Sequence, residues 1–196
     1  MTAAARTFFT ETEYLALERA SDRKHEFVDG AILAMAGARP AHNALASNVS
    51  AALVVLTRDR GCLTLSSDQR VHVPATKLYT YPDVTVACGD RRYDDADPPS
   101  LLNPTLIVEV TSDSTEDFDR GKKFLHYQSI VELRDYVIVS HRDRRIDHFR
   151  REGDGQWSLT THTRKDSAVA LPEHGGSIAL AEVYGNVDLD EGRPNR

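Results

Sequence analysis

The 196-residue sequence has little cysteine and no long apolar run. Its two cysteines, Cys62 and Cys88, are too few for a disulfide framework or a cysteine-rich zinc site. No uninterrupted apolar run, such as that over residues 51–56, approaches the ~20 residues that cross a bilayer. The amino terminus lacks the charged start and apolar core of a signal peptide. We therefore expect a cytoplasmic protein without membrane contact.

The sequence also lacks an excess of positive charge. A net charge of −6 and a pI of about 5.7 argue against a protein that coats nucleic acid with a broad basic surface. They leave room for an enzyme that binds nucleic acid over a small patch, and for one that gathers carboxylates around a cation. A phosphate-cradling glycine loop, a Gly-x-Ser-x-Gly motif and a paired-histidine zinc spacing are all missing.

Helical and strand patterns alternate along the chain, which predicts a mixed α/β sheet in one domain over residues 1–196. We expect its core over residues 11–185 and a frayed tail over 186–196. The predicted elements are a helix over 11–20 that begins at a Thr10-x-x-Glu13 capping box, a hairpin over 26–33 around Asp29-Gly30, a helix over 41–60, strands over 62–66, 70–73, 83–87 and 105–111, a surface loop over 91–103, a helix capped near Ser114, a strand over 135–140, a hairpin over 146–163 and an edge segment from Ser177.

Two acidic residues lie in apolar strand patterns. Asp83 leads into a Val-Thr-Val-Ala run, and Glu109 is embedded in Leu-Ile-Val-Glu-Val. Burial of a carboxylate without a partner is costly. A divalent cation shared by two carboxylates from neighbouring strands removes that cost and leaves positions for water and a phosphate. The alternative is that each acid pairs with an arginine or with backbone amides.

The helix predicted after the Glu109 strand carries Asp119, Lys123 and Tyr127 at i, i+4 and i+8, so these side chains share one face. A lysine beside the two acids would hold the attacking water and offset negative charge on a phosphate. The alternative is a solvated helix face with an Asp–Lys pair.

A basic stretch follows the strand at 135–140. It would contact phosphates or remain solvated charge on a hairpin. Its members are Arg142, Arg144, Arg145, Arg150 and Arg151.

Several of these motifs, in this order, resemble the Uma-type restriction endonuclease family, which is placed in the PD-(D/E)XK nuclease superfamily. The resemblance covers about residues 11–185. It is carried by Glu26-Phe-Val-Asp-Gly30 through Met35, His42, Pro82-Asp83, Ile107-Val-Glu-Val-Thr-Ser112, Asp119-x-x-x-Lys123-x-x-x-Tyr127, Asp135-Tyr-Val-Ile-Val139 and Leu180-Ala-Glu-Val-Tyr184.

The resemblance implies a restriction-endonuclease-like core with flanking helices and an added amino-terminal hairpin. It implies a Mg²⁺- or Mn²⁺-dependent endonuclease that hydrolyses phosphodiester bonds of nucleic acid, with DNA as the first candidate. Asp83 and Glu109 would bind the metal, and Glu26 would add a third acidic ligand. A homodimer is expected as well, since two sites suit the cutting of two strands.

The sequence departs from the superfamily pattern at Thr111, where a lysine is usual two residues after the glutamate. The resemblance implies that Lys123, rather than Lys122, stands in for it. We expect Lys123→Ala to abolish most cleavage while folding and metal binding stay nearly intact. His42 either touches substrate or caps a helix, and Tyr127 either positions the site or belongs to the core.

Two alternatives remain open at this stage. One is a catalytically silent module that keeps the fold in order to bind a partner or DNA. The intact acids Glu26, Asp83 and Glu109 argue against it, and Thr111 leaves room for it. The other is a metal-dependent hydrolase of a substrate other than nucleic acid.

Overall fold

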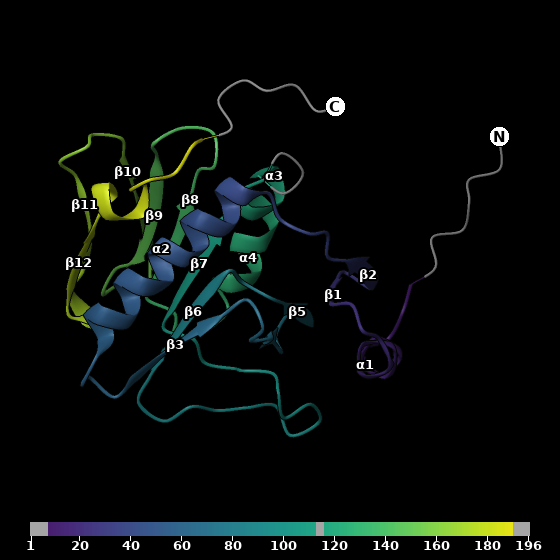
Figure 1. The fold of residues 1–196 in the computed structure, drawn as a ribbon. Coiled ribbons are helices and arrows are strands. Elements are labelled where there is room, and N and C mark those ends of the chain that lie inside the picture. Colours follow the sequence, from purple (N-terminus) through teal and green to yellow (C-terminus); the bar gives the residue numbers. More distant parts are fainter. Residues whose placement is uncertain (1–7, 113–115, 190–196) are drawn as a thin grey trace.

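The structure, a computed structural model, describes residues 8–112 and 116–189 (Figure 1). The strands are β1 (His25–Val28), β2 (Ala31–Ala34), β3 (Cys62–Ser66), β4 (Val71–Val73), β5 (Leu78–Thr80), β6 (Val84–Cys88), β7 (Leu106–Val110), β8 (Asp135–Val139), β9 (Ile146–Arg151), β10 (Trp157–His162), β11 (Ala168–Leu171) and β12 (Gly176–Ala179). The helical segments are α1 (Glu11–Ala20), α2 (Pro40–Thr57), α3 (Glu116–Phe118), the π-helical turn η1 (Asp119–Lys123), α4 (Phe124–Tyr127), the 3₁₀ turn η2 (Pro172–His174) and α5 (Leu180–Val183).

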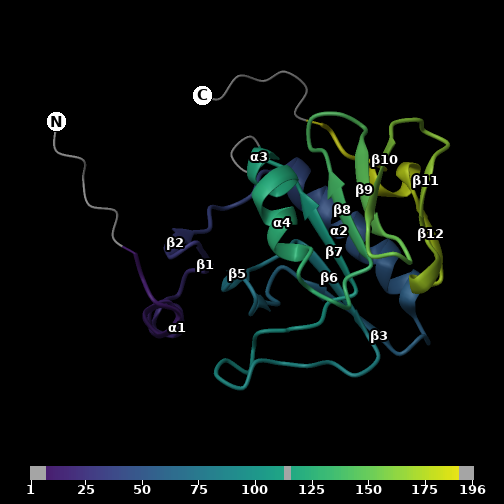
Figure 2. The same cartoon turned by 180° about the vertical axis from the view of Figure 1, so that it is seen from behind.

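A six-stranded mixed sheet with the order β10-β9-β8-β7-β6-β3 forms the centre of the fold. β7 and β8 are parallel neighbours, and the other pairs are antiparallel. A parallel pair needs a crossover connection, which the helical segment from α3 through η1 to α4 supplies. Figures 1 and 2 show α2 across one face of this sheet and α4 across the other.

The alternation of side chains along β7 decides what each face of the central sheet holds. Val108 and Val110 pack in the core that includes α2, whereas Ile107 packs on the opposite face in the core that includes Tyr127 of α4. Successive side chains of a strand point to opposite faces. Glu109 therefore shares the face of Ile107 and lies under the crossover helix.

A second, four-stranded sheet with the order β2-β1-β5-β4 contains the first hairpin. α1 packs on it through a small core that includes Tyr14, Phe27 and Tyr79. Tyr81, Pro82 and Asp83 then carry the chain from β5 into β6, which belongs to the central sheet. The two sheets are thus joined directly by this three-residue segment.

Most of the predicted elements are confirmed, and so is the mixed α/β class. α1 begins at a capping box in which the backbone N–H of Glu13 donates to Thr10 Oγ1. The first hairpin turns at Asp29 and Gly30, whose φ angles are 49° and 80°. α2 ends at Thr57, three residues before the predicted end. Among the described helices, none is long and apolar enough to cross a membrane.

Other elements differ from the prediction. β5 and β11 are missing from it, because strands of three and four residues show too little alternation to be recognised. The loop over 91–103 is not wholly at the surface, since Asp97 and Ser100 are buried. The segment from Ser177 forms both β12 and α5. The cap at Ser114 and the tail beyond Leu189 lie outside the described residues.

The cysteines form one cross-strand disulfide, which the sequence analysis did not foresee. Cys62 and Cys88 are directly opposite each other on β3 and β6, and the bond ties an edge strand to the strand that follows Asp83. Disulfides are rare in the reducing cytoplasm. The bond therefore counts against the expected cytoplasmic location.

We expect the loss of this disulfide to lower the free energy of unfolding by about 3 kcal/mol, because it closes a loop between residues 26 apart. Thermal unfolding of the wild type and of the double variant Cys62→Ser/Cys88→Ser, each with and without a thiol reductant, measures the effect. The reductant should lower the melting temperature of the wild type alone. A wild-type melting temperature that is the same with and without the reductant would contradict the prediction.

Candidate active site

The side chain of Glu109 lies beneath the crossover helix, where two groups bind the same oxygen atom. The Tyr127 hydroxyl donates a hydrogen bond to Glu109 Oε1 at 2.8 Å, and Lys123 Nζ lies 3.0 Å from that oxygen. Glu109 and Lys123 are only 4% and 5% exposed. The structure therefore contains a buried Lys–Glu ion pair whose carboxylate is held in place by a tyrosine.

The shared face predicted for Asp119, Lys123 and Tyr127 is confirmed, although the helix that carries them is not regular. Asp119–Lys123 form a π-helical turn, and all three side chains are buried. Such turns are rare and occur frequently at functional sites. Lys123 Nζ lies 3.6 Å from Asp119 Oδ1, whereas Lys122 is exposed. The two lysines thus differ as expected.

Glu26 of β1 is brought to the same ammonium from the other sheet. Its Oε1 lies 3.1 Å from Lys123 Nζ. The same oxygen accepts hydrogen bonds from the Thr80 hydroxyl and, at 3.3 Å, from the backbone N–H of Tyr81. Thr80 and Tyr81 were not predicted from the sequence, because β5, which ends at Thr80, is too short to show a strand pattern.

Asp83 lies just before β6, beside the peptide that joins Glu109 to Val110. Asp83 Oδ2 accepts a hydrogen bond from the backbone N–H of Val110 at 2.7 Å. Nε2 of His42, in the first turn of α2, lies 3.4 Å from the same oxygen. Asp83 and His42 therefore border the cluster around Lys123 on the side of α2.

The pKa values in the cluster reflect burial and an excess of carboxylates. Burial raises the pKa of Glu109 well above its usual value, Lys123 opposes the rise, and the charges of Asp119, Asp83 and Glu26 add to it. Burial acts to lower the pKa of Lys123, but Glu109 and Glu26 outweigh it and leave the pKa well raised. Lys123 is therefore a charged ammonium at neutral pH.

His42 is also affected by its carboxylate partner. Burial lowers its pKa, but the hydrogen bond to Asp83 and the charge of Asp83 raise it by more, so the net shift is upward. A histidine shifted in this way carries positive charge over a wider range of pH.

The donor set suits a divalent metal in its chemistry. In each of Glu26, Asp83 and Glu109, one carboxylate oxygen makes the contacts described above. Among the described residues, the second oxygen of each accepts no hydrogen bond. Carboxylate oxygens are the ligands that Mg²⁺ prefers.

The positions of Glu26, Asp83 and Glu109 are less favourable than their chemistry to a metal bound by all three carboxylates. Within the described residues, no group of three or more His, Cys, Asp or Glu side chains is placed to hold a metal ion. The Lys123 ammonium instead lies between Glu26 and Glu109. Glu26 is thus a partner of Lys123 in this arrangement, and its role as a third metal ligand stays a prediction.

Two other features of the sequence have structural roles here. Thr111 is buried, with its Oγ1 3.1 Å from His141 Nδ1. In the basic stretch, Arg150 pairs with buried Asp135, and Arg151 lies over the Trp157 ring. The stretch is therefore not a uniform patch of solvated charge.

The fold and the family of this chain follow from comparison with known proteins. The crystal structure of a putative nuclease from Anabaena variabilis, a member of the DUF820 family, covers 90% of this chain and 97% of its own length. Its TM-score is 0.74 at 16% sequence identity, which establishes a shared fold. The chain therefore has the same mixed α/β fold as that protein.

Residues 12–181 match the model of the Uma2 family, described as putative restriction endonucleases, and the chain belongs to that family. Two relatives come from Synechocystis sp., and both are uncharacterized proteins. One is 36% identical over 160 residues, which cover 82% of this chain and 90% of the relative. The other is 34% identical over 172 residues, which cover 88% of this chain and 89% of the relative.

The burial of Lys123 revises the expectation that this residue can be removed without cost to folding. Lys123→Ala leaves the buried carboxylates without their ammonium. Removal of one partner from a buried ion pair typically costs 3–5 kcal/mol, so we expect a loss of about 3 kcal/mol in the free energy of unfolding. Lys122→Ala removes an exposed charge and should change it by less than about 0.5 kcal/mol.

Denaturant unfolding of the two variants and the wild type at neutral pH, without divalent metal, measures this difference. Equal stability of the two variants would show that the pair with Glu109 adds nothing to folding.

Proposed function

We propose that this chain is a single-domain, divalent-metal-dependent endonuclease that hydrolyses phosphodiester bonds of DNA. The observation that carries the proposal is the Lys123 ammonium, which is buried between Glu26 and Glu109 and close to Asp119. Asp83 lies beside this cluster, because it accepts a hydrogen bond from the backbone N–H of the residue after Glu109. Membership of the Uma2 family supports the class of reaction.

Asp83 and Glu109 would hold Mg²⁺ or Mn²⁺, and Glu26, beside Lys123, would supply a further carboxylate. The metal, when bound, supplies a Lewis acid that polarises the phosphate and lowers the pKa of its bound water. The protein's own groups orient these ligands. Tyr127 fixes Glu109 by its hydroxyl, and His42 with the Val110 N–H fixes Asp83.

Lys123 would stabilise the negative charge that develops on the phosphate. Its ammonium is held by carboxylates before substrate arrives, so little reorganisation is needed at the moment of reaction. A preorganised charge in a site of low dielectric is worth far more than one in water. Asp119 keeps the lysine in place from one helical turn away.

A plasmid-nicking assay with Mg²⁺ or Mn²⁺ tests this function. We expect the wild type to nick supercoiled DNA, and Asp83→Ala to abolish nicking through the loss of a metal ligand. Lys123→Ala should lower the rate by about 10²–10³, which is typical when one charge-stabilising group is removed. Lys122→Ala is the matched control and should retain its activity.

The outcomes separate the proposal from its rivals. DNA binding without cleavage under any metal would favour a silent binding module. Neither binding nor cleavage of DNA would favour a hydrolase of another substrate. Equal rates for the two lysine variants would remove Lys123 from the mechanism.

We also propose that the active protein is a homodimer. Closed two-fold pairs are the commonest soluble assemblies, and two sites suit the cutting of two strands. The chain mass is 21.8 kDa. Light scattering at micromolar concentration should therefore give twice that mass, and a value equal to one chain would refute the dimer.

A further inference from the structure

Tyr81 lies at the junction of the two sheets and is connected to two acids of the site. Its backbone N–H donates to Glu26 Oε1 at 3.3 Å. Through Pro82 it leads directly to Asp83, which begins the approach to β6. Proline also restricts the backbone of the residue before it. A displacement of Tyr81 would thus move both carboxylates.

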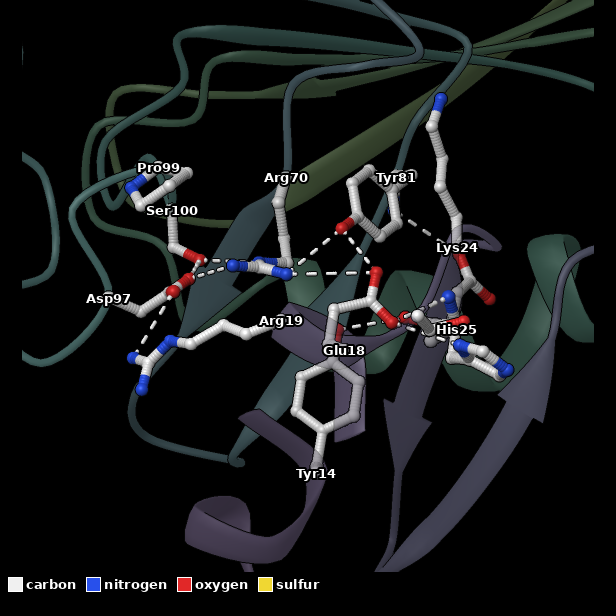
Figure 3. Close-up of polar contacts among 12 residues, drawn as sticks. Tyr14, Glu18, Arg19, Lys24, His25, Arg70, Tyr81, Asp97, Pro99 and Ser100 are labelled. Atoms are coloured by element: carbon white, nitrogen blue, oxygen red, sulfur yellow. Dashed lines mark hydrogen bonds and ion pairs between the residues drawn. The ribbon is translucent and has the colours of Figure 1, made fainter. Parts of the chain in front are cut away.

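The hydroxyl of Tyr81 is held by Glu18 and Arg70 (Figure 3). It donates to Glu18 Oε1 at 2.6 Å and accepts a hydrogen bond from Arg70 Nη1 at 2.9 Å. The Glu18 carboxylate in turn accepts the backbone N–H of His25, the neighbour of Glu26, at 3.0 Å. The Glu18 carboxylate therefore binds Tyr81 directly, and it holds Glu26 indirectly through the preceding residue, His25.

Arg70 fixes this anchor to the loop over 91–103. Its Nε donates to Ser100 Oγ at 2.9 Å, and its Nη2 donates to buried Asp97. Arg70 is 5% exposed and Asp97 is 1% exposed. Buried, paired charges of this kind hold one geometry, because any other arrangement leaves a charge without a partner.

The side chains of Glu18, Arg70, Tyr81 and Asp97 are hydrogen-bonded to one another. A pocket of about 490 Å³ lies beside them, lined in part by Glu18, Arg70, Tyr81 and Asp97. Within the described residues, none of these four side chains has a buried polar atom without a hydrogen-bond partner. No ligand is therefore needed to satisfy their hydrogen bonds, and the cluster is fixed by its own contacts.

We propose that Tyr81, held by Glu18 and Arg70, is a positioning residue that fixes Glu26 and Asp83 relative to Glu109. The inference rests on the proposed function, because it assigns Tyr81 a role only if these acids serve a metal. Residues behind metal ligands commonly change metal affinity 10- to 100-fold when they are replaced.

The test is Tyr81→Phe, which removes the hydroxyl and keeps the ring. We expect its Mn²⁺ affinity, measured by calorimetry without DNA, to fall about tenfold. In the nicking assay kcat should fall while KM for DNA stays unchanged. Glu18→Gln keeps an acceptor near the hydroxyl and should show a smaller loss in the same direction, and it replaces Tyr81→Phe if that variant does not fold.

Tyr184→Phe is the matched control. Tyr184 is equally a buried tyrosine, and its hydroxyl lies 2.6 Å from the Arg145 carbonyl and 3.0 Å from that of Ser140. It contacts none of the site carboxylates. Tyr184→Phe should lower the free energy of unfolding by about as much as Tyr81→Phe does. It should keep the wild-type affinity for Mn²⁺.

The possible results distinguish the positioning role of Tyr81 from the proposed nuclease function. Equal Mn²⁺ affinity in Tyr81→Phe and the wild type would overturn the positioning role and leave the nuclease proposal standing. Equal losses in Tyr81→Phe and Tyr184→Phe would show a general effect of stability and also overturn it. A wild type that binds no Mn²⁺ would overturn both proposals.

Discussion

The ammonium of Lys123, buried between Glu26 and Glu109, joins three separate parts of the chain: the amino-terminal sheet, the central sheet and the crossover helix. Each charge is costly to bury alone, and the cost is offset only when the partners meet with good geometry. The hairpin therefore has to dock at this place on the crossover helix. A chain that folded without this contact would leave an ammonium or a carboxylate buried without its partner.

The neighbouring strands and helices fix the place where Lys123 contacts Glu26 and Glu109. Alternation along β7 places Val108 and Val110 in one core and Glu109 under α4. The π-helical turn brings Asp119 and Lys123 to the same side, with the hydroxyl of Tyr136 bound to the Asp119 carbonyl at 2.9 Å. The acid site thus lies on packed strands and a packed helix. Rigid elements hold reactive groups more accurately than mobile loops do.

An acidic protein with this arrangement is consistent with action on a polyanion. The cluster holds more carboxylates than ammonium groups, since Glu26, Glu109 and Asp119 all lie close to the Lys123 ammonium. Under the proposed function this site would hold a divalent cation, which would reverse the local sign of the field that a phosphate meets. The overall charge of −6 then describes the surface as a whole and not the reacting centre.

The sequence by itself determined the features that depend on neighbours along the chain: the capping box at Thr10, the turn at Asp29-Gly30, the periods of α2 and β7, and the common face of Asp119, Lys123 and Tyr127. Together with the family resemblance, these patterns were enough to select Asp83, Glu109 and Lys123. Only the tertiary structure decided that Glu26 pairs with Lys123, that Cys62 bonds to Cys88, and that Arg70 and Asp97 hold Tyr81. These contacts join residues 11 to 97 positions apart in the chain. Strand register and packing bring them together, and neither is written in a local period of the sequence.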